Sequence, residues 1–244
     1  MPRREAAPLR KQVVELVRRS IILGHYRPGA RLVERVLCMR YAVSRTVIRE
    51  VLRQLETEGL VTVVPGRGPA VATLTPGDAI ALYEAREVLE AAAARLFAER
   101  ATTEERSELQ QRFATLKSAY SGDDLLHMLD LKDDYYGTLL AGARNSVLTG
   151  LLEVVHARIY LLRSISMRAQ GRARQSLEEL RVLTEAAVAE NAAAAAEAAI
   201  THVRAAAIVA TTELASAEAA GSAKPIVHTV RAVGRRHTSI RRPI

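Results

Sequence analysis

The sequence predicts a mainly α-helical protein in which three helices and a β-hairpin come first and a larger all-helical unit follows. Three observations predict this. Apolar residues recur with helical spacing along most of the chain. The pattern becomes strand-like only around residues 61–72, on both sides of a Gly-rich turn. With 244 residues and 49% hydrophobic side chains, the chain is long enough for one large or two small folded domains.

Each element of the first unit has its own local signal. Apolar residues at helical spacing predict the helices, Gly24 marks the end of the first one, and Ser44 is a good N-cap for the third. Two β-rich segments on either side of a Pro-Gly-Arg-Gly turn predict a hairpin. The predicted elements are helices over 9–23, around 33–40 and from Ser44 to Gly59, and strands over 61–64 and 70–72.

The second unit is predicted to consist of helices only. Thr75 can cap a new helix that has Pro76 at its first position, so residues 74–77 are expected to form a linker. Capping-box patterns beginning at Thr102 and at Ser176 predict two further helix starts. The predicted helices lie over 76–99, 102–119, 123–142, 145–169, 176–190 and 191–219.

The net charge of +8 is unevenly distributed along the chain. Residues 1–75 carry 14 basic and 6 acidic side chains (+8), residues 76–215 carry 15 and 20 (−5), and residues 216–244 carry 6 and 1 (+5). A basic head on an acidic body suggests that the head meets a polyanion. The predicted division is a first domain at 1–73, a linker at 74–77, a helical domain at 78–220 and a basic, mobile tail at 221–244.

Composition and motifs exclude several classes of protein. Cys38 is the only cysteine, which excludes a disulfide-stapled secreted domain and a multi-cysteine zinc site. The chain lacks an apolar run of about 18 residues and an apolar N-terminal signal, so we expect a soluble cytoplasmic protein with no membrane partner. Nucleotide-loop, nucleophile and HExxH signatures are also missing, and the adjacent acids at 123–124 and 133–134 make poor acid/base pairs. The protein is therefore predicted not to be an enzyme.

Three helices followed by a hairpin are the layout of a winged helix-turn-helix, whose second turn helix enters the major groove N-terminus first. Ser44, Arg45, Thr46 and Arg49 lie at that end of the third helix. Arginine can bond guanine with two nitrogens, and Ser or Thr can reach phosphate or base. The alternative, a merely solvated cationic helix face, is disfavoured by the turn before this helix and the hairpin after it.

The hairpin tip adds a second candidate contact with DNA. Gly66 and Gly68 let the backbone approach a neighbouring groove closely, and Arg67 between them supplies a cation.

The segments GHYRPGARL (24–32), VSRTVIREVLRQLE (43–56) and EGLV (58–61) resemble the DNA-binding domain of GntR-superfamily transcription regulators. The helical remainder, which opens with YEAREVLE (83–90), resembles the FadR-like subgroup and its FCD-type effector domain. The resemblance implies operator contacts by the residues at the matching positions, which are Arg35, Ser44, Arg45, Thr46, Arg49 and Gly66. Family members commonly have Pro where this chain has Val47, which is compatible with a helix start.

The same resemblance raises the question of a metal. The subgroup often binds a divalent ion through one Asp and three His, and the ion holds a carboxylate ligand. In this chain Lys132, Tyr136 and Leu180 stand at three of those positions, and only His202 matches. We therefore predict no metal cofactor, and we interpret His156, which has no family counterpart, as structural or solvated.

The substitutions favour a different kind of effector site. Lys132 would supply positive charge, with Arg86, Tyr136 and His202 as further donors to an organic acid or another polar metabolite. Arg86 matches a family arginine that tends to face the cavity. The alternative is that Lys132 lies on the surface and the cavity is apolar or vestigial.

These observations predict a ligand-responsive, DNA-binding transcription regulator. We expect a repressor that binds a pseudo-palindromic operator as a homodimer and is gated by a small-molecule effector. Two alternatives stay open: a DNA-binding dimer whose helical domain has lost its effector, and an enzyme or RNA-binding protein with a winged-helix accessory domain.

Overall fold

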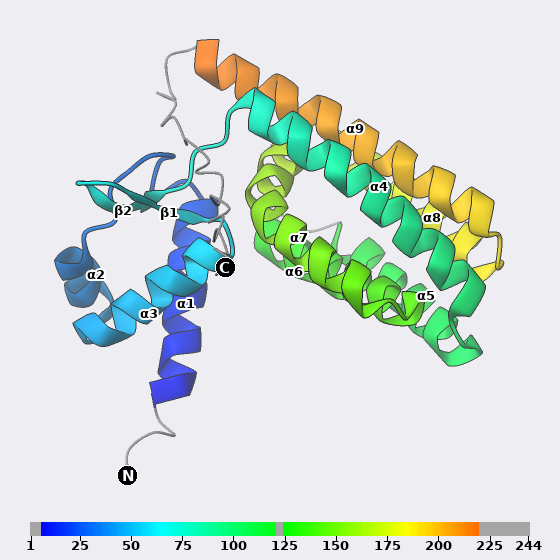
Figure 1. Cartoon of the computed structure of the whole chain (residues 1–244), viewed down its shortest axis with the longest axis horizontal. Coiled ribbons are helices and arrows are strands. Elements are labelled where there is room, and N and C mark those ends of the chain that lie inside the picture. The colour runs from blue at the N-terminus through cyan, green and yellow to red at the C-terminus, as the bar shows by residue number, and fades with distance from the viewer. Residues whose placement is uncertain (1–5, 121–123, 220–244) are drawn as a thin grey trace, which may run out of the picture.

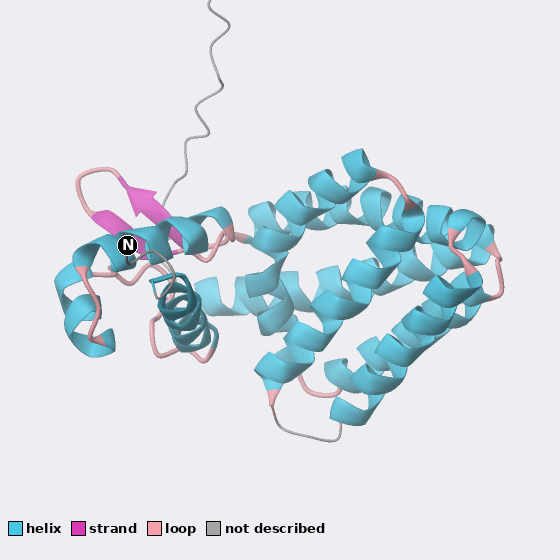
Figure 2. Cartoon of the chain, turned by 90° about the horizontal axis from the view of Figure 1, so that it is seen from below, coloured by secondary structure: helices cyan, strands magenta, loops and turns pink. Residues whose placement is uncertain are grey.

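The computed structural model describes residues 6–120 and 124–219 of the chain. These residues form a small winged unit and a larger helical unit that lie side by side (Figures 1 and 2). The winged unit comprises α1 (Ala6–Ile22), α2 (Glu34–Tyr41), α3 (Arg45–Thr57), β1 (Val61–Val64) and β2 (Gly68–Val71). The helical unit comprises α4 (Pro76–Arg100), α5 (Thr103–Ala119), α6 (Leu125–Ala143), α7 (Ser146–Arg168), α8 (Arg172–Val188) and α9 (Ala192–Ala219).

The core of the winged unit forms where α1 packs on α3. Val13 and Val17 of α1 and Ile48 and Val51 of α3 are fully buried, as their helical spacing predicts. The chain then turns at Gly59 and enters the antiparallel hairpin, whose register runs from Val61↔Val71 to Val64↔Gly68. Gly66 and Gly68 both have positive φ, a conformation that glycine adopts without strain.

Long apolar faces hold the helical unit together. The longest helix, α9, packs along α4 and α8, while α5 packs on α6 (Figure 1). Phe97, Leu109, Tyr135 and Leu180 are completely buried in the shared core. By length and composition alone α9 would be able to cross a membrane, but here its alanine-rich face packs against other helices of the unit.

Most predicted helix ends lie within a few residues of the observed ones. Thr75 and Thr102 both form the predicted capping boxes, with Asp78 and Glu105 as the reciprocal partners. The predicted start at Ser176 is wrong, because α8 already begins at Arg172 and Ser176 is buried inside it. The predicted tail over 221–244 lies outside the described residues.

Helix α7 joins the two units. Leu161 belongs to the core of the winged unit, and Arg168 donates a hydrogen bond to the carbonyl oxygen of Ile22 at the end of α1. Ile22 also packs with Leu129 of α6 and Met167 of α7. A displacement of α7 would therefore also displace the end of α1.

Candidate functional site

The N-terminus of α3 is built as the sequence predicts. Ser44 has an extended backbone, and its hydroxyl accepts a 3.3 Å hydrogen bond from the amide of Val47, which caps the helix. Arg45 and Thr46 then lie exposed in the first turn, while Ile48 faces the core. The backbone N–H groups of such an end attract phosphate, so this end of α3 suits contact with DNA.

Three other predicted DNA contacts are also exposed on the winged unit. Arg35 is exposed on α2, and Arg67 is exposed at the wing tip beside Gly66. Arg49 is also exposed, but its Nε donates to both carboxylate oxygens of Glu34, at 3.0 and 3.1 Å. DNA contact by Arg49 would therefore compete with this ion pair. All seven predicted contacts stay predictions.

The four predicted effector residues meet in the interior of the helical unit. Arg86, Lys132, Tyr136 and His202 come from α4, α6 and α9, and each is at most 2% exposed. The alternative in which Lys132 lies on the surface is therefore wrong. Burying this many polar groups in one place is costly, and such clusters are commonly found at functional sites.

One half of the cluster is centred on Glu90 of α4. The carboxylate of Glu90 accepts hydrogen bonds from Arg86 Nε and is 2.9 Å from His156 Nε2. Burial alone would raise the pKa of Glu90, but the charge of Arg86 and the contact with His156 lower it well below its usual range. Arg86 Nη2 also donates to the hydroxyl of Tyr136 at 3.1 Å. His156, expected to be structural or solvated, is thus part of the cluster.

The other half is centred on Glu179 of α8. Arg172 donates to both of its carboxylate oxygens, at 3.1 and 2.8 Å, and His202 Nδ1 lies 2.6 Å from Oε2. Burial lowers the pKa of His202 to about 3 despite this contact, so the imidazole is neutral at pH 7 and donates its Nδ1 proton to Glu179. Lys132 Nζ is nearby and donates to the hydroxyl of Ser176 at 2.7 Å.

Arg163 of α7 lies between the two halves. Its side chain is 3% exposed, its guanidinium carbon lies 4.9 Å from the centre of the Tyr136 ring, and its Nη1 donates to Asp133. Two further nitrogens of Arg163, Nε and Nη2, are buried without a hydrogen-bond partner, as are Arg86 Nη1 and Arg172 Nε. Buried donors are rarely left unpaired, so these atoms require an explanation.

The donor set does not fit the metal site that the resemblance implies. A lysine amine and a phenol occupy two of the ligand positions, and the third is Leu180, which belongs to the apolar core. Burial raises the pKa of Tyr136, which opposes formation of a phenolate ligand. Across residues 6–120 and 124–219, three or more His, Cys, Asp or Glu side chains do not come together in a metal-binding arrangement.

Sequence reasoning missed five members of the cluster. Local spacing carries part of the signal, because Glu90 follows Arg86 by four residues and Glu179 follows Arg172 by seven, so each acid faces an arginine on its own helix. Packing of the helices brings these pairs and Arg163 together. The missed residues are Glu90, Arg163, Arg172, Ser176 and Glu179.

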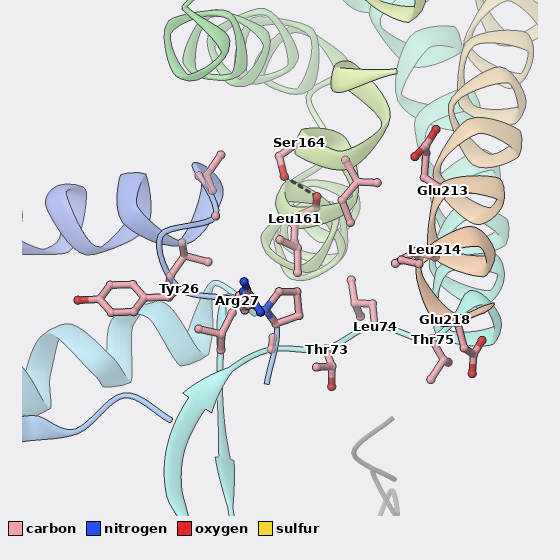
Figure 3. A pocket seen from close by; sticks show the side chains of 18 of the residues that line it. Tyr26, Arg27, Thr73, Leu74, Thr75, Leu161, Ser164, Glu213, Leu214 and Glu218 are labelled. Atoms are coloured by element: carbon pink, nitrogen blue, oxygen red, sulfur yellow. Dashed lines mark hydrogen bonds between the residues drawn. The ribbon is translucent and has the colours of Figure 1, made fainter. Parts of the chain in front are cut away.

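Two cavities lie between the helical unit and the winged unit. One of about 760 Å³ lies between the turn after α1, the linker, α7 and α9, and includes Tyr26, Leu74, Leu161 and Leu214 (Figure 3). The second, of about 530 Å³, has Tyr136 and His156 in its wall and Arg18 and Glu58 of the winged unit opposite. The buried cluster thus borders the interface of the two units.

A winged head with a capped, exposed α3, joined to a helical body with a buried charged cluster, defines a DNA-binding transcription regulator rather than an enzyme. Residues 9–71 match the family described as bacterial regulatory proteins, gntR family, and residues 81–205 match the FCD domain family. The chain belongs to the GntR family of transcription regulators and carries an FCD domain.

Curated relatives support this assignment. The HTH-type transcriptional regulator YdhC of Bacillus subtilis is 29% identical over 196 residues, which are 80% of this chain and 88% of that protein. The Nta operon transcriptional regulator of Aminobacter aminovorans is 33% identical over 60% of this chain and 69% of its own length. The galactonate operon transcriptional repressor of Escherichia coli is 26% identical over 79% and 92%.

Solved structures agree in fold. A GntR transcriptional regulator from Rhodococcus sp. RHA1 has a TM-score of 0.68 at 24% identity, covering 85% of this chain and 98% of that one. E. coli McbR/YncC has a TM-score of 0.66 at 21% identity, covering 80% and 93%. The arrangement of a winged head on a helical body is therefore shared with solved regulators.

Proposed function

We propose that this protein is a cytoplasmic repressor that binds a pseudo-palindromic operator as a homodimer and is released or retained by a small organic acid. The observation that carries the proposal is the pairing of an exposed, capped recognition helix with a buried cluster of cations beside the interface of the two units. Several relatives carry the word repressor in their names, which supports the direction of regulation.

An exposed apolar face on α7 supports the homodimer. Val147, Leu151 and Val154 repeat at helical spacing and are 73%, 53% and 64% exposed. Gly150 lies on the same face, and a Cβ at that position would meet nothing within 4 Å. A self-complementary apolar helix face with a glycine near its middle suits close approach of the same helix from a second copy, as a two-fold interface requires.

The dimer is tested by measuring molecular mass in solution with light scattering. Wild-type protein is expected to have twice the chain mass at micromolar concentration, and Leu151→Glu to have the mass of one chain, because a charge would then be buried in the interface. Val88→Glu, at a more exposed position on α4, is the matched control and should stay dimeric. A monomeric wild type would refute the dimer, and a dimeric Leu151→Glu would refute this face.

DNA binding is tested by fluorescence anisotropy with a labelled duplex at increasing salt. A dimer with roughly 6–10 phosphate contacts should lose affinity steeply between low and moderate salt, since each contact releases counterions. Arg67→Ala, at the wing tip, should reduce the slope by about one unit per lost contact. Affinity that is independent of salt would contradict a DNA-binding head.

The alternative of a helical domain without an effector makes a different prediction. Such a domain would gain nothing from buried cations whose donors lack partners, because they cost stability without a compensating contact. Thermal unfolding with a metabolite panel separates the two functions: a bound effector raises the melting temperature, and a purely structural domain does not respond.

A further inference from the structure

The unpaired nitrogens of Arg163 lie on one edge of its guanidinium group. Nη1 is taken by Asp133, while Nε and Nη2, which together form the side edge, are buried and have no partner. Two parallel N–H groups on one edge match the two oxygens of a carboxylate, in the strongest geometry that arginine offers. The structure therefore contains the arginine half of a bidentate arginine–carboxylate pair, buried away from solvent.

The side chains around this edge include one more basic group than acidic groups. Arg86 is paired with Glu90, Arg172 with Glu179 and Arg163 with the half-exposed Asp133. Lys132 is the remaining buried basic residue of the cluster, and its Nζ donates to the neutral hydroxyl of Ser176. Burial and the neighbouring arginines lower the pKa of Lys132 well below its usual range. One additional negative charge would balance the group.

We propose that the Nε/Nη2 edge of Arg163 binds the carboxylate of the effector directly, with Lys132, protonated when the carboxylate is bound, as its counter-charge and no metal ion between them. This inference rests on the proposed effector-gated function and names its ligand class, a small carboxylate. A planar carboxylate satisfies both free nitrogens of Arg163 and restores the charge balance at Lys132.

The departure from the implied metal site is itself part of this inference. A divalent ion would have to lie beside Arg86 and Arg163, and these two cations would repel it. The same cations attract a carboxylate. In this chain protein side chains therefore replace the charge that a metal would supply, and Arg163 is the residue that orients the ligand.

The experiment is a thermal-unfolding titration of the full chain with sodium acetate, the smallest probe that carries the proposed group, at ionic strength held constant with sodium chloride. Propionate, succinate and sulfate extend the series to longer, doubly charged and non-planar anions. Wild type should show a saturable rise in melting temperature with at least one carboxylate and a smaller rise with sulfate. Arg163→Gln and Lys132→Met should each weaken that carboxylate at least tenfold.

Arg95→Gln is the matched control, since Arg95 is a half-exposed arginine of α4 that pairs with Glu99 on its own helix. It should titrate like wild type. Circular dichroism establishes that each variant is folded, and if Arg163→Gln does not fold, Lys132→Met and Arg163→Lys carry the comparison, because the lysine lacks the fork.

Three results would overturn the proposal: no carboxylate acting beyond chloride, equal titration of wild type and the folded variants, or tight one-to-one binding of Zn²⁺ or Ni²⁺ by calorimetry. Operator binding measured on the same samples distinguishes failure of the carboxylate site from failure of the DNA-binding function. If DNA binding persists while carboxylates have no effect, the carboxylate site is wrong and the DNA-binding function stands.

Discussion

Lys132 is an unusual residue in the interior of this protein. A buried amine without an acidic partner lowers the stability of the folded state, because the unfolded chain solvates the charged form fully. Proteins keep such groups mainly where they serve binding or catalysis. The expected signature is therefore a residue whose removal stabilises the fold and weakens the response to ligand.

Lys132→Met is predicted to raise the free energy of unfolding at pH 7 by about 1–2 kcal/mol, since an apolar side chain of similar length replaces a costly amine. Because the folded-state pKa of Lys132 is lowered, the unfolded chain binds a proton that the folded chain does not between that pKa and 10.5. Wild-type stability should rise with pH in this window, and the advantage of the variant should shrink. Urea unfolding at pH 7, 8.5 and 10 measures both effects.

A variant that is less stable than wild type at pH 7 would contradict this account, because it would mean that Lys132 already has the partner it needs in the free protein. Lys117→Met, on the surface helix α5, is the control for the general loss of a positive charge.

Arg45 is the residue best placed to read a base. It is the first residue of α3, directly after the Ser44 cap, and it is exposed. Arg45→Ala should cost about 1–3 kcal/mol in specific operator affinity and relax the preference at one base position. Arg53→Ala, two turns further along the same helix, should affect affinity much less, and equal losses for both variants would argue against N-terminus-first docking.

At the scale of elements, Gly142 shows how closely α6 packs on α4. A Cβ at this position would lie 2.5 Å from two ring carbons of Phe97 and 3.3 Å from Ala101. Gly142→Ala should therefore destabilise the protein by about 1–3 kcal/mol through overpacking, even though alanine is the better helix former.

Gly137 is the control on the same helix, because it is exposed and a Cβ there would meet nothing within 4 Å. Gly137→Ala should stabilise the protein by about 0.5–1 kcal/mol. Chemical denaturation of both variants measures the difference, and changes of the same sign would show that the contact with Phe97 relaxes at no cost.

The elements also show where sequence reasoning succeeds and where it fails. The caps at Ser44, Thr75 and Thr102 were predictable because they depend on residues within one helical turn. Ser176 carries the same local pattern but is buried inside α8, where it accepts a hydrogen bond from Lys132 on another helix. A local sequence pattern does not show that the side chain hydrogen-bonds a residue of another helix instead.

The candidate site follows the same rule. Arg86, Lys132, Tyr136 and His202 were found through resemblance, position by position, and they do meet in space. Arg163 and Arg172 belong to no local motif, and they joined the cluster only when the packing of α7 and α8 was known. Sequence alone therefore identified four members of the buried cluster but missed the arginine that we propose orients the ligand.

At the scale of the whole molecule, α7 connects three surfaces. Its first half carries the exposed face of Val147 and Leu151, and its last two turns carry Arg163 together with Leu161 and Arg168, which contact the winged unit. A ligand that repositions Arg163 would shift the helix on which the winged unit rests. Such a shift would change the spacing of two heads in a dimer, and operator affinity would change only as far as the ligand binds the two arrangements differently.

Arg168→Met should therefore weaken the coupling between the proposed ligand site at Arg163 and the winged unit. The variant keeps the apolar stem but loses the hydrogen bond to Ile22, so ligand affinity should stay within twofold of wild type. The coupling between ligand and operator should fall by about 1 kcal/mol. Paired titrations, with operator measured with and without the best-binding carboxylate, give this coupling directly.

Arg181→Met is the matched control for this prediction, because Arg181 pairs with Glu178 and Glu185 on its own helix. Unchanged coupling in Arg168→Met would show that the signal reaches the winged unit by another route.

We propose that this chain reads DNA as a two-fold symmetric pair of winged heads. The most direct measurement is selection of binding sites from a random DNA pool by the purified full chain, with Arg45→Ala selected in parallel. We predict enrichment of one pseudo-palindrome whose half-sites lie about one or two helical turns apart, and its loss or relaxation in the variant. An asymmetric single site, no enriched sequence, or the same sequence enriched by the variant would contradict the account.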